Sequence, residues 1–422
     1  MTVAAVPPLR LGRAGDAPAI TAAGRTVTYR QLAALIRSHA EPAPGPATTA
    51  GSDLVEALAA VFGAARRGRP VLVTDPAGPP AALPAVLPPA TFLVVVTSGT
   101  SGHPRPVLRT AASWTSSFAP FSELTGIGAD DRVLLTGPLH ATMHLFAAVH
   151  ALAVGAHLVD DPVVATAAHL VPSRLAVLLD ELGSDAALRR VVVAGAALPE
   201  RIADRALRRG LTVTEYYGAA ELSFVAARRV PGPLLPFEGA EVRIRDGVVW
   251  VRSPYLALGY PTGVDGPFRR DQDGFATVGD LAVRAGGGLR IRGRGDAAIT
   301  TGGATVVVED VEAALLTVPG IAAVAVVGVP HPRLGQLVVA VLEPSPGADL
   351  AGVRAAARRL LRDQSLPRRW LVADRLPRTP GGKVARHLVA RAATRLDGGP
   401  VTGPDGDGPI PPGAPALRPL PS

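Results

Sequence analysis

Apolar runs alternate with amphipathic stretches through the middle of the chain. The amphipathic stretches 144–154 and 199–210 have the length of crossover helices, which return a chain to the same edge of a parallel sheet. The runs between them are rich in Val, Leu and Thr and are typical of strands. These runs are TFLVVV at 91–96, DRVLLTG at 131–137, RRVVVAG at 189–195 and LTVTEYYG at 211–218. The alternation predicts a parallel α/β region whose ligands bind at the carboxyl ends of the strands.

The pattern changes after residue 240. Residues 241–292 hold short paired runs closed by Asp-Gly and Gly-rich turns, which predict antiparallel hairpins. A smaller βα unit is predicted to follow Gly293. Its helices are expected near 308–316, near 350–362 and after Lys383, and its strands in IAAVAVVGV, QLVVAVLEP and RWLVAD.

These patterns predict an α/β protein with a large N-terminal domain of parallel and mixed sheets with helices and a small α+β C-terminal domain. We place the large domain at 1–292 and the small domain at 293–395, with the connection near Asp296. The first 90 residues are rich in loops. Residues 396–422 are rich in Pro and Gly with almost no apolar periodicity, which predicts a disordered tail.

Composition excludes several classes of protein. Of the 422 residues, 48% are hydrophobic and 18% are charged, so the chain is not wholly disordered. Cysteine is absent, which excludes disulfides, thiolate metal sites and cysteine nucleophiles. No run approaches about 18 apolar residues and the start has no signal-peptide core, so we expect a cytoplasmic protein without a membrane span. The net charge of +8 could attract polyanions, but the arginines are scattered and aromatic residues make up only 4%, so no nucleic-acid partner is expected.

A single lysine, Lys383, stands among 43 basic residues, and the other 42 are arginine. A compact ammonium on a flexible stem can reach a reacting oxygen where a planar guanidinium fits badly. Lys383 is therefore a catalytic candidate. The alternative is that this lysine remains by chance in a sequence biased towards arginine and has no catalytic role.

A loop of hydroxyls and glycines follows the run at 91–96. Glycines let backbone N–H groups approach phosphate oxygens, hydroxyls donate further hydrogen bonds, and Arg105 at the far end supplies charge. A Walker loop would have Gly-Lys-Ser/Thr opening a helix, and a hydrolase elbow would have glycine where His103 stands. A phosphate-binding loop is favoured over both, and a flexible polar loop without a ligand remains the alternative. The loop reads Thr97-Ser98-Gly99-Thr100-Ser101-Gly102-His103-Pro104-Arg105.

Six short motifs lie in order between residues 97 and 386. They are the loop at 97–105, Tyr217-Gly218-Ala219-Ala220-Glu221, Val278-Gly279-Asp280, Gly293-Arg294-Gly295-Asp296, Thr301-Gly302-Gly303 and the run from Pro377 to Arg386, PRTPGGKVAR. In the same order they resemble T-S-G-T-T-G-x-P-K, Y-G-x-T-E, T-G-D, G-R-x-D, a glycine pair and P-x-T-x-x-G-K-x-x-R. The chain is thus similar to the AMP-forming adenylating superfamily, which includes the acyl-CoA synthetases of the AMP-dependent synthetase and ligase family.

The resemblance implies an AMP-forming acid–thiol ligase. A small-molecule carboxylic acid would react with ATP to give acyl-AMP and pyrophosphate, and CoA or the phosphopantetheine of an acyl carrier protein would then take the acyl group. The implied cofactors are ATP, Mg²⁺ and CoA. Lys383 would stabilise charge between the carboxylate and the α-phosphate, Glu221 would bind Mg²⁺, and Arg105 would act at the phosphates. The implied nucleotide-binding residues are Thr97, Ser98, Gly99, Thr100, Ser101, Gly102, Tyr217, Gly218, Ala220, Asp280 and Arg294.

The resemblance also implies that the small domain rotates about a hinge at Asp296. One orientation would deliver Lys383 for adenylation, and the other would bring Gly302 and Gly303 to a pantetheine channel. Amino-acid-activating relatives have an aspartate near the start of the segment that corresponds to PLHATMHLF in this chain. No aspartate stands in this segment here, so a carboxylic acid without an amino group, such as a fatty or aryl acid, is favoured. The implied acyl-substrate residues are His140, Gly195, Ala196 and Ala219, although His140 is almost equally well explained as a packed or solvent-facing histidine.

The chain departs from the family pattern in several places. Ala220 and Val278 stand where threonine is usual, and the region before residue 91 is shorter than in family members. A lost hydrogen bond to a charged group costs about 1.5–3 kcal/mol. The alternative function is therefore a catalytically weakened adenylation-like binding or scaffold protein. A hydrolase or a phosphoryl transferase is disfavoured, because neither a nucleophile elbow nor a Walker lysine is present.

Overall fold

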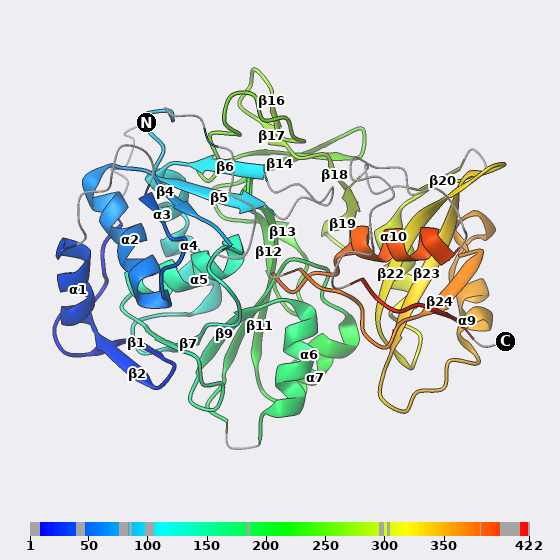
Figure 1. Ribbon diagram of the computed structural model, residues 1–422, viewed down its shortest axis with the longest axis horizontal. Helices are drawn as coiled ribbons and strands as arrows, with labels where there is room; N and C mark the ends of the chain where they lie inside the picture. Colours follow the sequence, from blue (N-terminus) through cyan, green and yellow to red (C-terminus); the bar gives the residue numbers. More distant parts are fainter. Residues whose placement is uncertain are drawn as a thin grey trace. The chain divides into compact units, whose positions relative to one another are not determined.

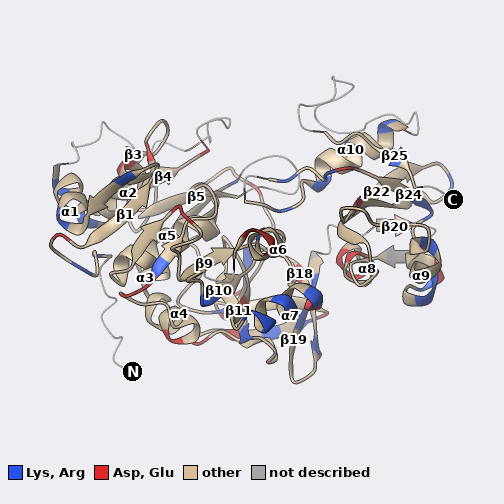
Figure 2. Cartoon of the chain, turned by 90° about the horizontal axis from the view of Figure 1, so that it is seen from below, with Lys and Arg blue, Asp and Glu red and all other residues tan. Residues whose placement is uncertain are grey.

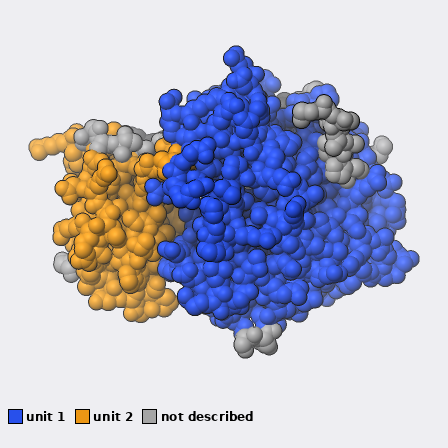
Figure 3. All heavy atoms as spheres, turned by 180° about the vertical axis from the view of Figure 1, so that it is seen from behind, with its two compact units in different colours: residues 1–99, 103–278, 284–290 blue, residues 100–102, 279–283, 291–422 orange. Residues whose placement is uncertain are grey.

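The chain forms two compact units (Figure 3). Unit 1 contains most of the chain up to Val278 together with Arg284–Arg290, and unit 2 contains Gly279–Val283 and the chain from Ile291 onwards. Among the described helices, none is both long and apolar enough to cross a lipid bilayer. The computed structural model describes residues 9–38, 47–75, 83, 87–97, 105–183, 186–294, 299–301, 304–379, 381–396 and 414–420.

A nine-stranded sheet forms the centre of unit 1 (Figure 1). The strands from β11 to β1 run parallel to one another, and β2, β12 and β13 add antiparallel edges. This sheet confirms the predicted α/β class and the strands predicted at 131–137, 189–195 and 211–218. In order across the sheet the strands are β13 (Leu235–Pro236), β12 (Ser223–Arg229), β11 (Thr212–Ala219), β10 (Arg190–Val193), β9 (Ala167–Leu170), β7 (Arg132–Leu134), β8 (His157–Val159), β1 (Pro18–Ala22) and β2 (Arg25–Thr28).

Helices cover both faces of this sheet, because parallel strands connected by crossover helices are buried on both sides. Val192 of β10 packs into the same cluster as Leu145 of α5 (Thr142–Ala153). Its neighbour Val193 faces the other way and packs with Ala206 of α7 (Glu200–Arg208). These two helices confirm the predicted crossovers. The other helices of unit 1 are α1 (Tyr29–Ser38), α2 (Leu54–Arg67), α3 (Ala111–Thr115), α4 (Phe118–Thr125) and α6 (Pro172–Glu181).

The run at 91–96 lies in a different sheet, which corrects its assignment to the parallel region. Its strand β5 is parallel to β4 but antiparallel to β6, with Thr97 opposite Arg105. The loop between these two residues is too short for a crossover helix, so the chain can only turn back on itself. The sheet has the order β3 (Ala47–Thr48), β4 (Val71–Val73), β5 (Leu93–Thr97) and β6 (Arg105–Arg109).

The antiparallel region predicted after residue 240 is confirmed. β14 (Glu241–Arg245) and β15 (Val248–Arg252) form a hairpin through Asp246 and Gly247, whose φ angles of 50° and 80° are those of a tight hairpin turn. The strands β16 (Arg269–Arg270) and β17 (Ala276–Thr277) pair beside β15. The chain then continues through β18 (Asp280–Ala285) and β19 (Gly288–Arg294).

Unit 2 is built on a long antiparallel hairpin, β22 (Ile321–His331) and β23 (Gly335–Pro344). β24 (Arg369–Val372) runs parallel to β23, and β20 (Ile299–Thr301) and β21 (Ala304–Val306) extend the other side. One face packs against α8 (Val308–Leu315) and α9 (Val353–Leu360), with a short 3₁₀ turn at Asp363–Ser365, and the other packs against α10 (Arg386–Leu396). This confirms the predicted α+β arrangement of the small region.

The predicted disordered tail is wrong for residues 414–420. Within them, β25 (Arg418–Pro419) pairs with β24, and Leu420 is only 3% exposed in the cluster that also holds Trp370. The Pro/Gly-rich composition gave no signal for Leu420, an apolar side chain that the small sheet buries. Pro419 is tolerated because β25 is an edge strand, where one missing N–H costs little.

Candidate active site

The carboxyl ends of β7, β10 and β11 lie at one edge of the main sheet, because these strands run parallel through β9. His140 lies between β7 and α5, Gly195 and Ala196 follow β10, and Tyr217 lies near the end of β11. Ala219 is the last residue of β11. The structure therefore brings the predicted acyl-substrate residues and part of the predicted nucleotide site to the same edge of unit 1.

The β11–β12 hairpin presents Glu221 at its turn. A Cβ added to Gly218 would come within 2.1 Å of the Ser223 carbonyl oxygen, so only glycine fits at this close approach. Glu221 is just 3% exposed, and its carbonyl oxygen accepts a hydrogen bond from Ala257 N at 2.8 Å. The turn therefore holds a carboxylate inside the protein.

A buried arginine, Arg109 at the end of β6, supports this turn. It is 1% exposed and donates hydrogen bonds to the carbonyl oxygens of Ala220 at 2.6 Å, Tyr255 at 2.6 Å and Ser113 at 3.0 Å. Burial lowers the pKa of Arg109 to about 9, and the charge of Glu221 opposes that shift. Because this pKa is above 7, Arg109 is a cation at neutral pH and stabilises the buried carboxylate beside it.

Tyr260 contacts the same carboxylate from a third segment. Leu108 of β6 donates to the carbonyl oxygen of Gly259 at 2.8 Å, which fixes the residue that follows. The Tyr260 hydroxyl donates to Glu221 Oε1 at 2.7 Å. Burial and the Glu221 charge raise the pKa of Tyr260, so its phenol keeps the proton that it donates.

Arg105 lies at the start of β6, directly after the predicted phosphate loop. Its Nε donates to the carbonyl oxygen of Asp265 at 3.0 Å, and its charge acts on Tyr260. Thr97, at the other end of the loop, lies opposite Arg105 in the β5–β6 ladder. The two described ends of the loop thus emerge on the β-hairpin that also carries Arg109. A strand, not a helix, follows the loop, which is consistent with the argument against a Walker motif.

Sequence reasoning missed both Arg109 and Tyr260. The only signal for Arg109 was an arginine closing the apolar strand RPVLR, and Tyr260 had no signal beyond its place after Gly259. Their roles depend on β6 pairing with a segment about 150 residues later in the chain, as the bridge between Leu108 and Gly259 shows.

Two histidines lie near the edge of the sheet that holds the predicted acyl-substrate residues. His140 Nε2 is 3.7 Å from Asp75 Oδ2, and the His140 side chain is 15% exposed. His144 is buried, and its Nδ1 lies 3.2 Å from Thr136 Oγ1. Burial lowers the pKa of His144 to about 4, so this ring is neutral at pH 7. His140 is therefore partly packed beside a carboxylate, while His144 belongs to the interior.

In unit 2, Lys383 lies in a tight loop between two bridged residues, Arg378 and Val384, directly before Val384. Thr379 N donates to the Lys383 carbonyl oxygen at 2.7 Å, and Gly382 has a φ of 79° that suits glycine. The Lys383 side chain is exposed. The loop thus presents an ammonium from a backbone that is held by hydrogen bonds.

The base of this loop is fixed by charged pairs. Arg386 makes a two-point contact with Glu312, with Nε to Oε1 at 3.1 Å and Nη2 to Oε2 at 2.5 Å. Its Nη1 is 3.5 Å from Glu309 Oε1, and burial raises the pKa of that second carboxyl. Leu376 N donates to Glu343 Oε2 at 2.8 Å on the other side. The arginine of the last motif is therefore a structural anchor of the loop that carries Lys383.

The remaining predicted residues have less structural support. Asp280 is buried at the start of β18, and Arg294 ends β19. Several predicted positions lie outside the described residues, namely Ser98, Gly99, Thr100, Ser101, Gly102, Asp296, Gly302 and Gly303, together with the side chain of Arg294.

Comparisons with known proteins identify the family. The sequence model of the AMP-binding enzyme family matches residues 84–261, and the family model of the AMP-binding enzyme C-terminal domain matches residues 310–383. A probable 2-succinylbenzoate–CoA ligase from Mycobacterium tuberculosis is 33% identical over 338 residues, which cover 72% of this chain and 85% of that protein. This chain belongs to the AMP-binding enzymes. The resemblance drawn from the six motifs is confirmed.

Further AMP-binding relatives and solved structures agree with this family. An uncharacterised acyl–CoA ligase from Bacillus subtilis is 29% identical over 343 residues, covering 73% of this chain and 70% of that protein. The crystal structure of ATP-bound MatB from Rhodopseudomonas palustris matches with a TM-score of 0.78 at 22% identity, over 90% of this chain and 96% of that one. The MatB likeness shows that this chain has the same fold.

Proposed function

We propose that this protein is an AMP-forming acid–thiol ligase that activates a carboxylic acid with ATP and transfers the acyl group to CoA. The observation that carries the proposal is the buried carboxylate of Glu221, which accepts a hydrogen bond from Tyr260 and interacts with the charge of Arg109, whose guanidinium holds the neighbouring Ala220 carbonyl oxygen. A carboxylate in this position serves phosphate and metal chemistry better than it serves stability, because burying a charge is costly. The CoA-ligase activity named for relatives such as indoleacetate–CoA ligase supports the same reaction.

Glu221 fits the role of a Mg²⁺ ligand. Mg²⁺ is commonly held by one or two carboxylates plus the phosphates of the substrate, and not by a full protein cage. Among the described residues no group of three or more His, Asp or Glu could hold a metal ion, so a single carboxylate with ATP is the arrangement that fits. Bound there, Mg²⁺ would neutralise charge on the phosphates of ATP. Tyr260 would hold Oε1 of Glu221 in place, and Arg105 would add a cation at the end of the phosphate loop.

In the first half-reaction, a carboxylate oxygen of the acid attacks the α-phosphorus of ATP. A new oxygen–phosphorus bond forms, the bond to the β-phosphate oxygen breaks, and pyrophosphate leaves with the electron pair. Lys383 is proposed to stabilise the negative charge that grows on the α-phosphate oxygens, as a point charge does well. Asp280 is proposed to accept from the ribose hydroxyls, with Tyr217 and Gly218 beside the base.

In the second half-reaction, the thiol of CoA loses its proton and attacks the acyl carbon. A carbon–sulfur bond forms, and AMP leaves with the oxygen that came from the carboxylate. Gly302 and Gly303 are proposed to line the thiol channel after rotation about Asp296. A phosphopantetheine carrier protein is a second acceptor with the same thiol chemistry, and the CoA-ligase relatives favour CoA.

The acid is proposed to lack an α-amino group. His140, Gly195, Ala196 and Ala219 border the edge at which it would bind, and none of them carries a carboxylate for an ammonium. The carboxylate of Asp75 lies close to that edge, with Oδ2 3.7 Å from His140 Nε2, so it already faces an imidazole. Relatives named for 2-succinylbenzoate, indoleacetate and ferulate support a ring-bearing acid as the first class to test.

Pyrophosphate exchange tests this proposal. The purified chain is given ATP, Mg²⁺, labelled pyrophosphate and one acid at a time from aryl, fatty and amino-acid sets. We expect label to enter ATP only when an aryl or fatty acid is present. Lys383→Arg is the matched control, because it keeps the charge but replaces the ammonium by a planar group. If no acid of any class supports exchange, although ATP still binds, the result would instead favour a binding or scaffold protein.

A further inference from the structure

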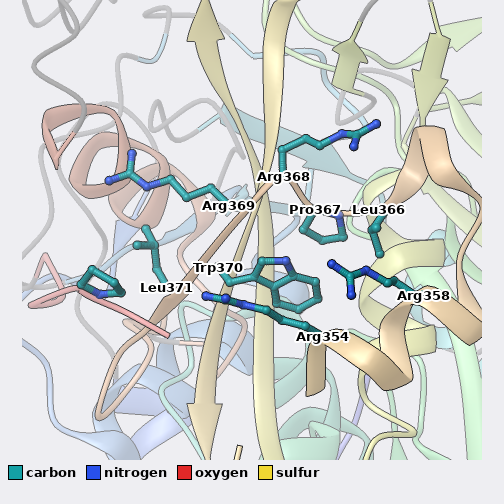
Figure 4. Close-up of a pocket in the computed structure, with 9 residues that line it drawn as sticks. Arg354, Arg358, Leu366, Pro367, Arg368, Arg369, Trp370 and Leu371 are labelled. Atoms are coloured by element: carbon teal, nitrogen blue, oxygen red, sulfur yellow. The ribbon is translucent and has the colours of Figure 1, made fainter. Parts of the chain in front are cut away.

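A cavity of about 410 Å³ lies in unit 2 between α9, β24 and the C-terminal strand β25. Arginines dominate its wall, and among its nine lining residues, all in the described part of the chain, none is acidic. None of the residues assigned to the ligase reaction lines it. The lining residues are Arg354, Arg358, Leu366, Pro367, Arg368, Arg369, Trp370, Leu371 and Pro419 (Figure 4).

Two of these arginines form a pair on α9. Arg354 and Arg358 are four residues apart, so their side chains lie on the same face of the helix. Figure 4 shows both running toward Trp370, while Arg368, just before β24, and Arg369, at its start, extend in opposite directions. α9 reads VRAAARRL and contains no acidic residue, and it is coloured largely blue in Figure 2. Like charges at this spacing destabilise a helix unless an anion compensates them.

Arg354 carries one N–H group that has no acceptor among the described residues. Its Nη2 donates to the carbonyl oxygen of Leu420 at 2.8 Å, so the guanidinium is held in place. Its Nε is buried with no hydrogen-bond partner in the described part of the chain. A buried N–H without an acceptor is costly, and an oxyanion in the cavity would remove that cost.

The C-terminal segment completes the wall. Leu420 N donates to the Trp370 carbonyl oxygen at 3.0 Å, and Pro419 lies opposite Leu371 in the ladder between β24 and β25. The segment therefore contributes Pro419 to the wall of the cavity and holds Arg354 through the Leu420 carbonyl oxygen. This part of the chain lies beyond residue 383, at which the match to the C-terminal family model ends.

We propose that this cavity binds a small ligand with clustered phosphate groups. The planar guanidinium matches phosphate oxygens in two-point contacts, and a pair of guanidinium groups suits a ligand with more than one phosphate. The volume is within the range of small-molecule pockets and is too small for a protein helix. Two molecules of the proposed reaction carry this chemistry, namely pyrophosphate and the 3′-phosphorylated nucleotide end of CoA. The binding itself does not depend on the proposed reaction.

Hydrogen exchange on the full chain tests the proposal, because it reports where a ligand binds. Pyrophosphate and adenosine 3′,5′-bisphosphate are added separately, and exchange is followed in peptides that cover 353–371 and 414–420. We expect slower exchange in these peptides with at least one probe. In Arg358→Gln the dissociation constant read from that protection should rise at least about tenfold, as expected for the loss of a charged hydrogen bond.

Arg359→Gln is the matched control. Arg359 is the next residue of α9 and is also exposed, but it does not line the cavity, so this variant should bind as the wild type does. Protection by pyrophosphate alone would assign the cavity to the product, and protection by the bisphosphate alone would assign it to the nucleotide end of CoA. Absence of protection with both probes, or equal weakening in the two variants, would overturn the proposal. The readout needs no turnover, so a failed ligase assay is a separate result.

Discussion

Glu221 and Lys383, the two side chains to which we assign the most direct roles in adenylation, have opposite surroundings. Glu221 is 3% exposed and is held by Tyr260 and by the buried charge of Arg109. Lys383 is exposed, and hydrogen bonds hold the backbone of the loop that carries it. The difference in exposure fits the two proposed tasks. The proposed Mg²⁺ ligand would work from a rigid, water-poor position, whereas a cation that is proposed to be delivered and withdrawn would work from an exposed loop.

The largest effect is expected from Arg109→Met. The change leaves the carbonyl oxygens of Ala220 and Tyr255 unpaired and removes the cation beside Glu221, so the free energy of unfolding should fall by about 3–5 kcal/mol. Urea denaturation measures this loss. Arg174→Met is the control, because Arg174 and Glu181 form an exposed pair at 3.1 Å, worth about 1 kcal/mol or less. Equal costs for the two variants would mean that Arg109 is not a buried anchor.

Lys383→Ala should have the opposite effect, with a large loss of activity and almost no loss of stability. Removing the charge at the transition state should slow acyl-AMP formation by about 10²–10³-fold, while an exposed position should change the free energy of unfolding by no more than about 0.5 kcal/mol. Thioester formation from supplied acyl-AMP should change little. The two half-reactions are measured separately in single-turnover experiments. Equal loss in both would contradict the assigned role.

Acid should weaken unit 1 through its buried histidines. Burial lowers the pKa of His144 to about 4 and that of His150 to about 3, below the ordinary value of 6.5. Below pH 6.5 the unfolded chain therefore binds more protons than the folded one, and each group costs up to about 1.4 kcal/mol per pH unit until its folded pKa is reached. Unfolding between pH 7 and pH 5 measures the slope. His150→Gln, which can keep the contact with Ser122 Oγ, should reduce it.

Unit 2 carries a half-buried carboxyl, Glu309, whose pKa shift has the opposite effect on stability. Burial raises the pKa of Glu309, so its folded form favours the proton and loses stability as the pH rises through that raised value. Hydrogen exchange at pH 7 and pH 5 resolves the two units, and acidification should speed exchange in the peptide 144–153 more than in the peptide 308–315. The reverse order would contradict this assignment of the buried groups.

The smallest effect is expected from Tyr260→Phe. The change removes one hydrogen bond to Glu221 Oε1 and leaves the ring in place, so the pyrophosphate-exchange rate should fall by about tenfold. If Tyr260 positions a Mg²⁺ ligand, the Mg²⁺ concentration that gives half the maximal rate should rise as well. Tyr255→Phe removes the hydrogen bond to the Glu238 carbonyl oxygen and is the matched control. A lower rate without any change in the Mg²⁺ requirement would show that Tyr260 only packs.

Much of the fold could be predicted from local pattern. The valine-rich run at 189–195 is a strand buried on both faces, and Asp246-Gly247 closes the hairpin that its turn chemistry demands. Lys383 was singled out by its chemistry alone. Arg109 and Tyr260 could not be found this way, because their partners are set by the pairing of β6 with a distant segment. The strand at the C-terminus was missed for a similar reason, since Leu420 gains its partners only from the assembled small sheet.

The fate of a carboxylate oxygen tests the central claim most directly. An accepted acid labelled with a heavy oxygen isotope in its carboxyl group is incubated with ATP, Mg²⁺ and CoA, and the nucleotide products are analysed by mass spectrometry. The account predicts AMP that carries one heavy oxygen atom, because the acid attacks the α-phosphorus and AMP later leaves with that oxygen. Formation of ADP, or of AMP without the label, would contradict it.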